Sequence, residues 1–269
     1  MTSAGLAADP GLADLIRSLR ATARDRVFSL TYGGCKYWVK TAGQPRLRSS
    51  VLLQRCLAVV AGLPLLRPPR MPGGALGLAT EAEAIRGLET AGFPVPAVIA
   101  CSGQWLVLGD AGEALEPRLN AADDAETRWM MIGRAGALLT RLHAAGHWHG
   151  GAQIRNFSWS EDAPGLLDFE DHDLPDMPLA DRQARDLLLF LYSLTRYDRE
   201  PGAPRLTKLA TAMLATAGPE TRRILRRLRQ RMAWLMVLAK LVEPWGGRDV
   251  RQALAADAAI SAALTAHPD

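Results

Sequence analysis

The second half of the chain consists of segments in which apolar residues recur at the spacing of an α-helix, and this pattern constrains the fold most. These segments are 124–146, 180–197, 203–216, 219–242 and 248–265. Because each such helix must cover its apolar face with another element, together they predict a helical body. The first half differs, since aromatic and β-branched residues flank Gly33-Gly34 and predict a β-hairpin. We therefore expect an α+β protein with strands mainly in the N-terminal half of the chain and helices in the C-terminal half.

Composition excludes several classes of protein. Of the 269 residues, 48% are hydrophobic and 22% charged, which suits a packed core and argues against a disordered chain. Cys35, Cys56 and Cys101 are odd in number and widely spaced, which excludes a disulfide framework and a cysteine zinc site. A net charge of +4 is too small to indicate a nucleic-acid partner. We find neither a signal-peptide pattern nor about 20 consecutive apolar residues, so we expect a cytoplasmic protein.

Shorter segments complete the expected N-terminal part of the chain. Residues 11–24 and 49–62 have helical patterns, and 105–108 reads as a buried strand. In 80–91, Thr80 followed by Glu83 predicts a capping box that opens a helix. We expect the division between this N-terminal part and the helical body at residues 109–112.

Chemistry-bearing residues follow one another in a definite order along the chain. Lys40 ends an apolar strand, Glu81 lies in a predicted helix, the loop 149–156 runs from a histidine to an asparagine, and Asp168-Phe169-Glu170 follows a short apolar strand. This series, from about Lys40 to Asp186, resembles the protein-kinase-like superfamily. More narrowly, it resembles the bacterial lipopolysaccharide core kinases of the Kdo/WaaP type and the aminoglycoside phosphotransferases.

The resemblance implies a two-lobed fold. Residues 1–108 would form a small mixed N-lobe with an antiparallel sheet, 109–112 the hinge, and 113–269 a mostly helical C-lobe that carries the catalytic-type and metal loops. ATP and Mg²⁺ would bind between the lobes.

In the N-lobe, the resemblance implies that Lys40 contacts the nucleotide phosphates, as a point cation on a rigid strand can. Glu81 would pair with Lys40 and hold it towards the phosphates. Gly33-Gly34 is the only glycine pair in the region of a phosphate-binding loop, and a hairpin turn is its simpler interpretation. Lys36 and Glu83 are the neighbouring alternatives, and all these charges could also be solvated surface groups.

In the C-lobe, His149 would brace the catalytic-type loop, and Asn156 and Asp168 would hold Mg²⁺ through hard oxygen ligands. Asp186 lies in an apolar helix and would accept hydrogen bonds from the loop backbone, because a buried carboxylate without a partner is costly. A glycine-rich turn beside core histidines is the alternative interpretation of this loop.

The loop departs from the family at one position. Gly151 stands where the catalytic aspartate is expected, and glycine can neither orient nor deprotonate a substrate hydroxyl. The acidic residues Asp171, Asp173 and Asp176 follow the metal loop. They could form a solvated acidic loop, or one of them could supply a replacement carboxylate. Asp171 is the first of them to test by mutation.

A basic segment lies at 222–231. Its helical spacing gathers arginines into rows beside an apolar side, and the residues concerned are Arg222, Arg223, Arg226, Arg227, Arg229 and Arg231. A solvated helix face is the simple interpretation, and an anionic glycolipid or the inner-membrane surface is the sharper one. Nucleic acid is not expected, because no aromatic residues are interleaved.

The leading hypothesis is therefore a kinase-like protein that binds ATP and Mg²⁺ and transfers phosphate to a sugar hydroxyl of an envelope glycolipid. The rival is a pseudokinase, a nucleotide-binding or scaffold module without transfer, because of Gly151. A membrane-surface or nucleic-acid-binding helical protein that uses only the arginines is a third interpretation. The sequence does not indicate the acceptor or the oligomeric state.

Overall fold

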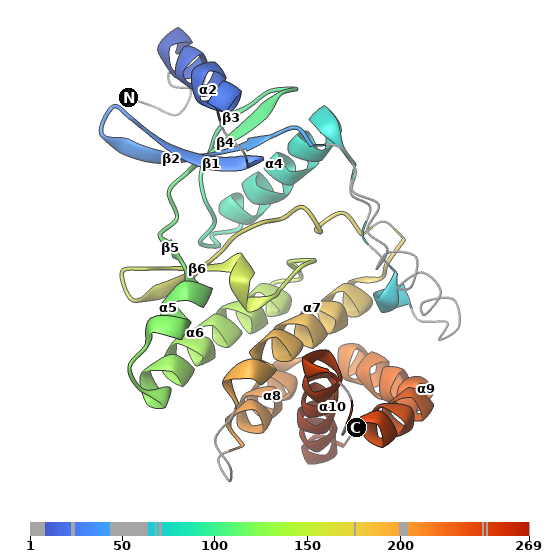
Figure 1. The fold of residues 1–269 in the computed structure, drawn as a ribbon. Helices are drawn as coiled ribbons and strands as arrows, with labels where there is room; N and C mark the ends of the chain where they lie inside the picture. The colour runs from blue at the N-terminus through green and yellow to red at the C-terminus, as the bar shows by residue number, and fades with distance from the viewer. Residues whose placement is uncertain are drawn as a thin grey trace.

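The computed structural model describes residues 9–22, 25–43, 64–67, 69, 72–174, 176–198, 204–243, 245 and 247–268. It confirms the α+β class: a four-stranded sheet with two helices lies at one end of the molecule, and a helical body lies at the other (Figure 1). The helix expected within 49–62 is outside the described residues.

The four-stranded sheet is antiparallel and has the order β1-β2-β4-β3. Its strands are β1 (Val27–Tyr32), β2 (Cys35–Thr41), β3 (Val98–Cys101) and β4 (Trp105–Gly109). The predicted hairpin is confirmed, with Tyr32 opposite Cys35 across the Gly33-Gly34 turn. Both glycines have positive φ, 58° and 79°, which a two-residue turn of type I′ requires at its central positions.

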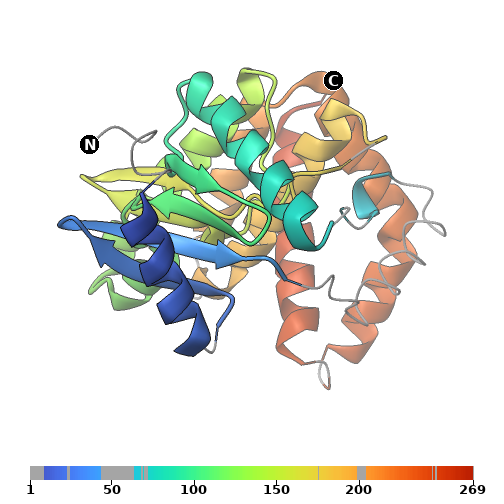
Figure 2. The same cartoon turned by 90° about the horizontal axis from the view of Figure 1, so that it is seen from above.

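Helices α2 (Pro10–Thr22) and α4 (Gly74–Thr90) lie on opposite faces of this sheet (Figure 2). Leu12 and Ile16 of α2 pack with Val39 of β2 in one apolar cluster. The residues of α4 belong to the main core, which also contains Leu106 and Leu108 of β4. Because successive residues of a strand face opposite sides, Val39 lies towards α2 and Lys40 lies towards α4.

The start of α4 differs from the prediction. The helix begins at Gly74 rather than Thr80, and Gly73 caps it without a side-chain hydrogen bond, so the expected Thr80–Glu83 capping box is wrong. The buried face of the helix extends back to Leu78, so the helix already includes residues before Thr80. Glu81 is therefore an interior residue of the helix on its buried face, beside Leu78 and Ile85.

The helical body contains α5 (Leu115–Ala121), α6 (Ala125–Ala144), α7 (Leu179–Leu194), α8 (Arg205–Thr216), α9 (Pro219–Val242) and α10 (Arg248–Ala266). All but the short α5 were predicted within a few residues of these bounds. The N-cap of α6 is Asp124, whose carboxylate accepts a hydrogen bond from Thr127 N at 2.7 Å. It ends before Gly146, which has a φ of 80°.

A second antiparallel sheet, in the order β5-β6-β7, lies against the helical body. It consists of β5 (Glu113–Ala114), β6 (Phe157–Ser160) and β7 (Ala163–Leu166). Short 3-10 turns occur at η1 (Pro64–Leu66), η2 (Ile154–Asn156) and η3 (Thr195–Tyr197). Turn η2 leads into β6 and the segment 167–174 follows β7, so this sheet brings the loop 149–156 beside the Asp-Phe-Glu segment.

One apolar core runs from α4 and β4 through Phe157 and Phe169 to helices α6 to α10. Phe157, Phe169 and Phe190 are among its largest fully buried side chains. The loops that carry the candidate site are thus attached to a continuous packed interior. Of the helices that the structure describes, none is long and apolar enough to span a bilayer.

Candidate functional site

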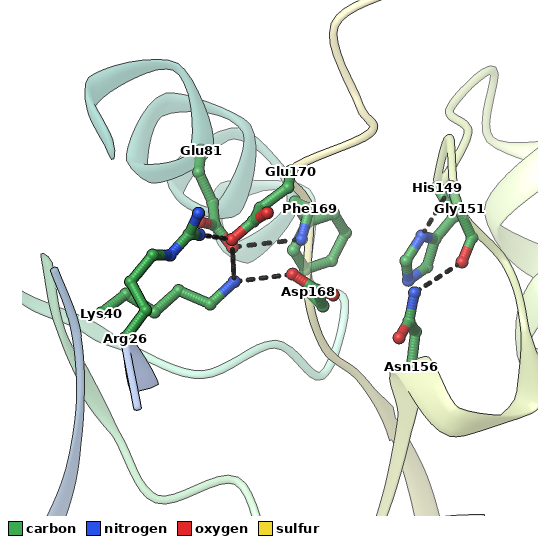
Figure 3. A network of polar contacts seen from close by, with 9 residues as sticks. All are labelled: Arg26, Lys40, Glu81, His149, Gly151, Asn156, Asp168, Phe169 and Glu170. Carbon is green, nitrogen blue, oxygen red and sulfur yellow. Dashed lines mark hydrogen bonds and ion pairs between the residues drawn. The ribbon is translucent and has the colours of Figure 1, made fainter. Parts of the chain in front are cut away.

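Lys40 is the centre of an ion-pair cluster formed by three segments that are far apart in the sequence (Figure 3). Its Nζ lies 2.6 Å from Glu81 Oε1 on α4 and 2.6 Å from Asp168 Oδ1 in the loop after β7. Burial by itself lowers the pKa of Lys40, but the carboxylates of Glu81 and Asp168 outweigh it and raise the pKa above its ordinary value. The ammonium is therefore charged at neutral pH.

Glu81 joins the sheet to the loop after β7. Its side chain is 2% exposed, and Oε1 also accepts a hydrogen bond from Phe169 N at 3.2 Å. A buried carboxylate needs such partners, since its desolvation is otherwise uncompensated. Glu81 thus holds both Lys40 and the backbone beside Asp168.

Two further residues belong to the cluster and were not predicted. Glu170 Oε1 lies 3.4 Å from Lys40 Nζ, and Arg26 pairs with the same carboxylate. Glu170 adjoins Phe169 in the sequence motif, which was a weak signal for its position. Arg26 precedes β1 and carries no motif that could have identified it.

Asp168 has a left-handed backbone conformation, with a φ of 59°. Aspartate tolerates this region better than most residues, and strained positions of this kind concentrate at functional sites. Partial burial raises the pKa of Asp168, but the Lys40 ammonium outweighs it and keeps the pKa below its ordinary value. The side chain is 44% exposed, so this ionised carboxylate faces both Lys40 and solvent.

The loop 149–151 is held from below by Asp186 of α7. The carboxylate of Asp186 is fully buried and accepts hydrogen bonds from His149 N at 2.6 Å and Gly150 N at 2.8 Å. His143 Nε2 lies 3.2 Å from the same carboxylate. Although burial raises the pKa of Asp186, these donors outweigh it and lower the pKa below its ordinary value.

His149 and Asn156 fix the two ends of the loop. The His149 ring is fully buried and stacks on Phe169 with 4.8 Å between ring centroids, and burial lowers its pKa. Its Nδ1 accepts a hydrogen bond from Gly151 N at 3.3 Å. Asn156 Nδ2 donates to the Gly151 carbonyl at 2.8 Å, which leaves the amide oxygen on the side that faces Asp168 (Figure 3).

Not every candidate lies in this cluster. Gly33 and Gly34 form the tip of the β1–β2 hairpin, roughly 20 Å from Lys40 along β2 at the usual rise of a strand. The structure therefore does not bring these glycines to the ion pairs. Lys36 is half-exposed and lies 3.5 Å from Asp110, and Glu83 is exposed on α4. The structure places Lys40 and Glu81 in contact and leaves both alternatives outside.

The donor atoms of the cluster suit Mg²⁺ only in combination with a ligand. In the part of the chain that the structure describes, no three His, Cys, Asp or Glu side chains are grouped to hold a metal by themselves. Asp168 and Asn156 supply one carboxylate and one amide oxygen. Mg²⁺ is commonly held by one or two carboxylates together with substrate phosphates and water, so this set fits that mode of binding.

Several arginines of α9 form hydrogen bonds or ion pairs with other parts of the same chain. Three of them bind other parts of the chain: Arg222 the Ala217 carbonyl, Arg226 the His267 carbonyl, and Arg229 the Asp257 carboxylate. Arg223 is exposed and pairs with Glu220 at 2.5 Å, and Arg227 is also exposed. The expected basic surface of Arg222, Arg223, Arg226 and Arg227 is thus reduced to its exposed members.

Comparison with known proteins adds little to this geometry. No protein-family model matches the chain. An uncharacterized protein of Haemophilus influenzae is 28% identical to it over 160 residues, which is 58% of this chain and 58% of that relative.

Proposed function

We propose that the chain is a two-lobed, protein-kinase-like phosphotransferase that binds ATP and Mg²⁺. The two lobes would be residues 1–108 and 113–269, joined by a hinge at 109–112. The observation that carries the proposal is the Lys40 ammonium, held between Glu81 and Asp168 from three separate segments. A buried, charged lysine beside an ionised carboxylate that is open to solvent suits the binding of a metal–phosphate group.

Each residue of the cluster has a defined part in this proposal. Lys40 would contact the phosphates, and Glu81 would keep its ammonium in place. Asp168 and Asn156 would hold Mg²⁺ together with phosphate oxygens, and the ion would neutralise phosphate charge when bound. His149 and Asp186 would position the loop without touching the substrate.

The acceptor in this proposal is a sugar hydroxyl of an envelope glycolipid, and it rests on the resemblance to lipopolysaccharide core kinases. Gly151 favours the second candidate, a pseudokinase that binds nucleotide and transfers nothing. Binding and transfer must therefore be measured separately.

Titration calorimetry with a non-hydrolysable ATP analogue and Mg²⁺ tests the binding step. We expect Lys40→Met and Asp168→Asn each to weaken binding at least 10-fold, because each removes a group opposite the phosphates or the ion. Lys36→Met is the matched control, since Lys36 lies on the same strand but outside the cluster. Circular dichroism would verify that each variant is folded.

Two results would refute nucleotide binding at this site: no heat signal with the wild-type chain, or unchanged affinity in Lys40→Met. Transfer is then measured with labelled ATP and lipopolysaccharide fragments. Binding without transfer to any acceptor would favour the pseudokinase.

A further inference from the structure

The space beside Gly151 is occupied by the carboxylate of Asp171. A Cβ atom built on Gly151 would lie 3.2 Å from Asp171 Oδ2 and 3.3 Å from Asp171 Cβ, with Asn156 Nδ2 at 3.5 Å. These are its three nearest neighbours. The carboxylate of a residue in one loop thus lies in contact with the point at which a side chain of the other loop would begin.

The neighbouring glycine is what allows this approach. Gly150 has a φ of 91°, and a Cβ on it would lie 2.3 Å from the backbone oxygen of Asp171. No side chain fits there, so Gly150 lets the segment around Asp171 pack directly on the loop. Gly151, in contrast, has no positive φ, and its backbone could carry any side chain. A side chain at position 151 would instead meet Asp171, which would have to shift by a few tenths of an ångström.

The segment around Asp171 is fixed in this position. His172 N donates to the Phe169 carbonyl at 3.1 Å, which closes a turn around Asp171. Trp148 Nε1 donates to the His172 carbonyl at 3.0 Å, and the Trp148 and His172 rings stack with 4.5 Å between centroids. The turn is therefore attached on one side to Phe169 and on the other to the loop that begins at Trp148.

The Asp171 carboxylate is available for a substrate. Among the residues that the structure describes, it makes no hydrogen bond or ion pair. The positive charge of Arg185 lies nearby, but this guanidinium donates to the carbonyls of Gly150, Leu65 and Arg67. Partial burial raises the pKa of Asp171 above its ordinary value, which strengthens its basicity as a proton acceptor.

The other acidic residues of this region are placed differently. Glu170 is paired with Arg26 and lies near Lys40. Asp173 lines a shallow groove with Trp148 and Arg182, and Asp176 is exposed. Of these carboxylates, Asp171 is the one that reaches the position of Gly151.

We propose that Asp171 is the catalytic carboxylate of this protein. Gly151 stands at the sequence position expected for the catalytic aspartate, and the carboxylate of Asp171 takes over that role from the neighbouring loop. The inference rests on the proposed function. Asp171 would orient the acceptor hydroxyl and accept its proton. The hydroxyl oxygen forms a bond to the γ-phosphorus of ATP, the bond from that phosphorus to the β,γ-bridging oxygen breaks, and its electron pair leaves with ADP. The proton then passes from Asp171 to solvent.

Rescue by relocation of the carboxylate tests this proposal. The probe reaction is ATP hydrolysis with Mg²⁺, in which water is the acceptor. We expect Asp171→Ala and Asp171→Asn to lower turnover about 100-fold or more with unchanged nucleotide affinity. Asp173→Asn is the matched control and should retain turnover. The double variant Asp171→Ala, Gly151→Asp should recover at least 10-fold over Asp171→Ala, which a merely structural role of Asp171 would not produce.

Thermal unfolding gives a second measurement that does not depend on activity. Gly151→Asp should lower the melting temperature in the wild-type background, because it places a second carboxylate against Asp171. The decrease should be smaller when Asp171 is alanine, since the two positions then no longer compete.

The outcomes separate this inference from the proposed function. Wild-type turnover in Asp171→Asn, absence of rescue in the double variant, or nucleotide binding without hydrolysis or transfer would each overturn the role of Asp171 and leave nucleotide binding intact. Absence of nucleotide binding would overturn the proposed function, and the role of Asp171 with it.

Discussion

Replacement of Asp186 gives a direct measure of how firmly the loop 149–151 is held. The Asp186 carboxylate is fully buried and accepts two backbone hydrogen bonds, from His149 N and Gly150 N. Asp186→Ala leaves both donors buried without an acceptor. Asp186→Asn retains the shape of the side chain but has one acceptor oxygen, and its amide group faces the second donor.

The magnitude follows from the number of bonds lost. A hydrogen bond to a charged group contributes roughly 1.5–3 kcal/mol, so the loss of the two backbone bonds alone makes Asp186→Ala less stable by about 4 kcal/mol, and the contact with His143 is lost as well. For a chain of this size, that lowers the melting temperature by roughly 10 °C. Asp186→Asn should cost about half as much.

Urea unfolding of both variants, with Asp181→Asn as control, is the assay. Asp181 lies on the same helix and is also buried, but burial raises its pKa above the ordinary value, so its charge opposes folding. Asp181→Asn should be neutral or stabilising at pH 7. Equal effects of Asp181→Asn and Asp186→Asn would refute the reasoning.

The pH dependence has a definite sign. Because the pKa of Asp186 is lower in the folded state than its ordinary 3.8, the folded chain binds this proton less readily than the unfolded chain. The stabilisation by Asp186 is complete above about pH 4 and declines as the pH falls towards the folded pKa. The difference between wild type and Asp186→Asn should therefore shrink below pH 4.

Three further outcomes can be measured by the same unfolding method. Gly150→Ala should cost at least about 2 kcal/mol, because Gly150 has a positive φ and meets the Asp171 carbonyl; a stable variant would show that this close approach is not needed. Burial lowers the pKa of His172 to about 4, so between pH 6.5 and pH 4 wild type should lose about 3 kcal/mol more stability than His172→Phe. Arg229→Ala should cost roughly 0.5–1 kcal/mol through the lost contact with Asp257. Unchanged stability would show that Arg229 behaves as a solvated surface residue.

The helices and the first hairpin could be predicted because their signals are local. The periodicity of α6 to α10 and the Gly33-Gly34 turn depend on residues adjacent in the chain. The start of α4 could not be read in the same way, because a capping pattern at Thr80 competed with apolar spacing that begins at Leu78. The structure has the longer helix, whose buried face includes Leu78.

The candidate site divides in a similar manner. The sequence order suggested Lys40, Glu81 and Asp168, and their contacts are present in the structure. Glu170 lies in the Asp168-Phe169-Glu170 motif, but its pairing with Arg26 could not be predicted, because Arg26 belongs to no motif and lies 144 positions away. The choice of Asp171 among neighbouring aspartates likewise depends on the approach of two loops, which no spacing in the sequence records.

The packing of α2 on the sheet has a consequence for truncation of this chain. Leu12 and Ile16 cover Leu30, Val39 and Val107 on the face opposite Lys40. A shortened chain that begins at Val27 would keep every residue of the ion-pair cluster except Arg26, yet it would expose this apolar face to water. Such a fragment should associate through the uncovered sheet. It should therefore become insoluble although it keeps most of the residues of the ion-pair cluster.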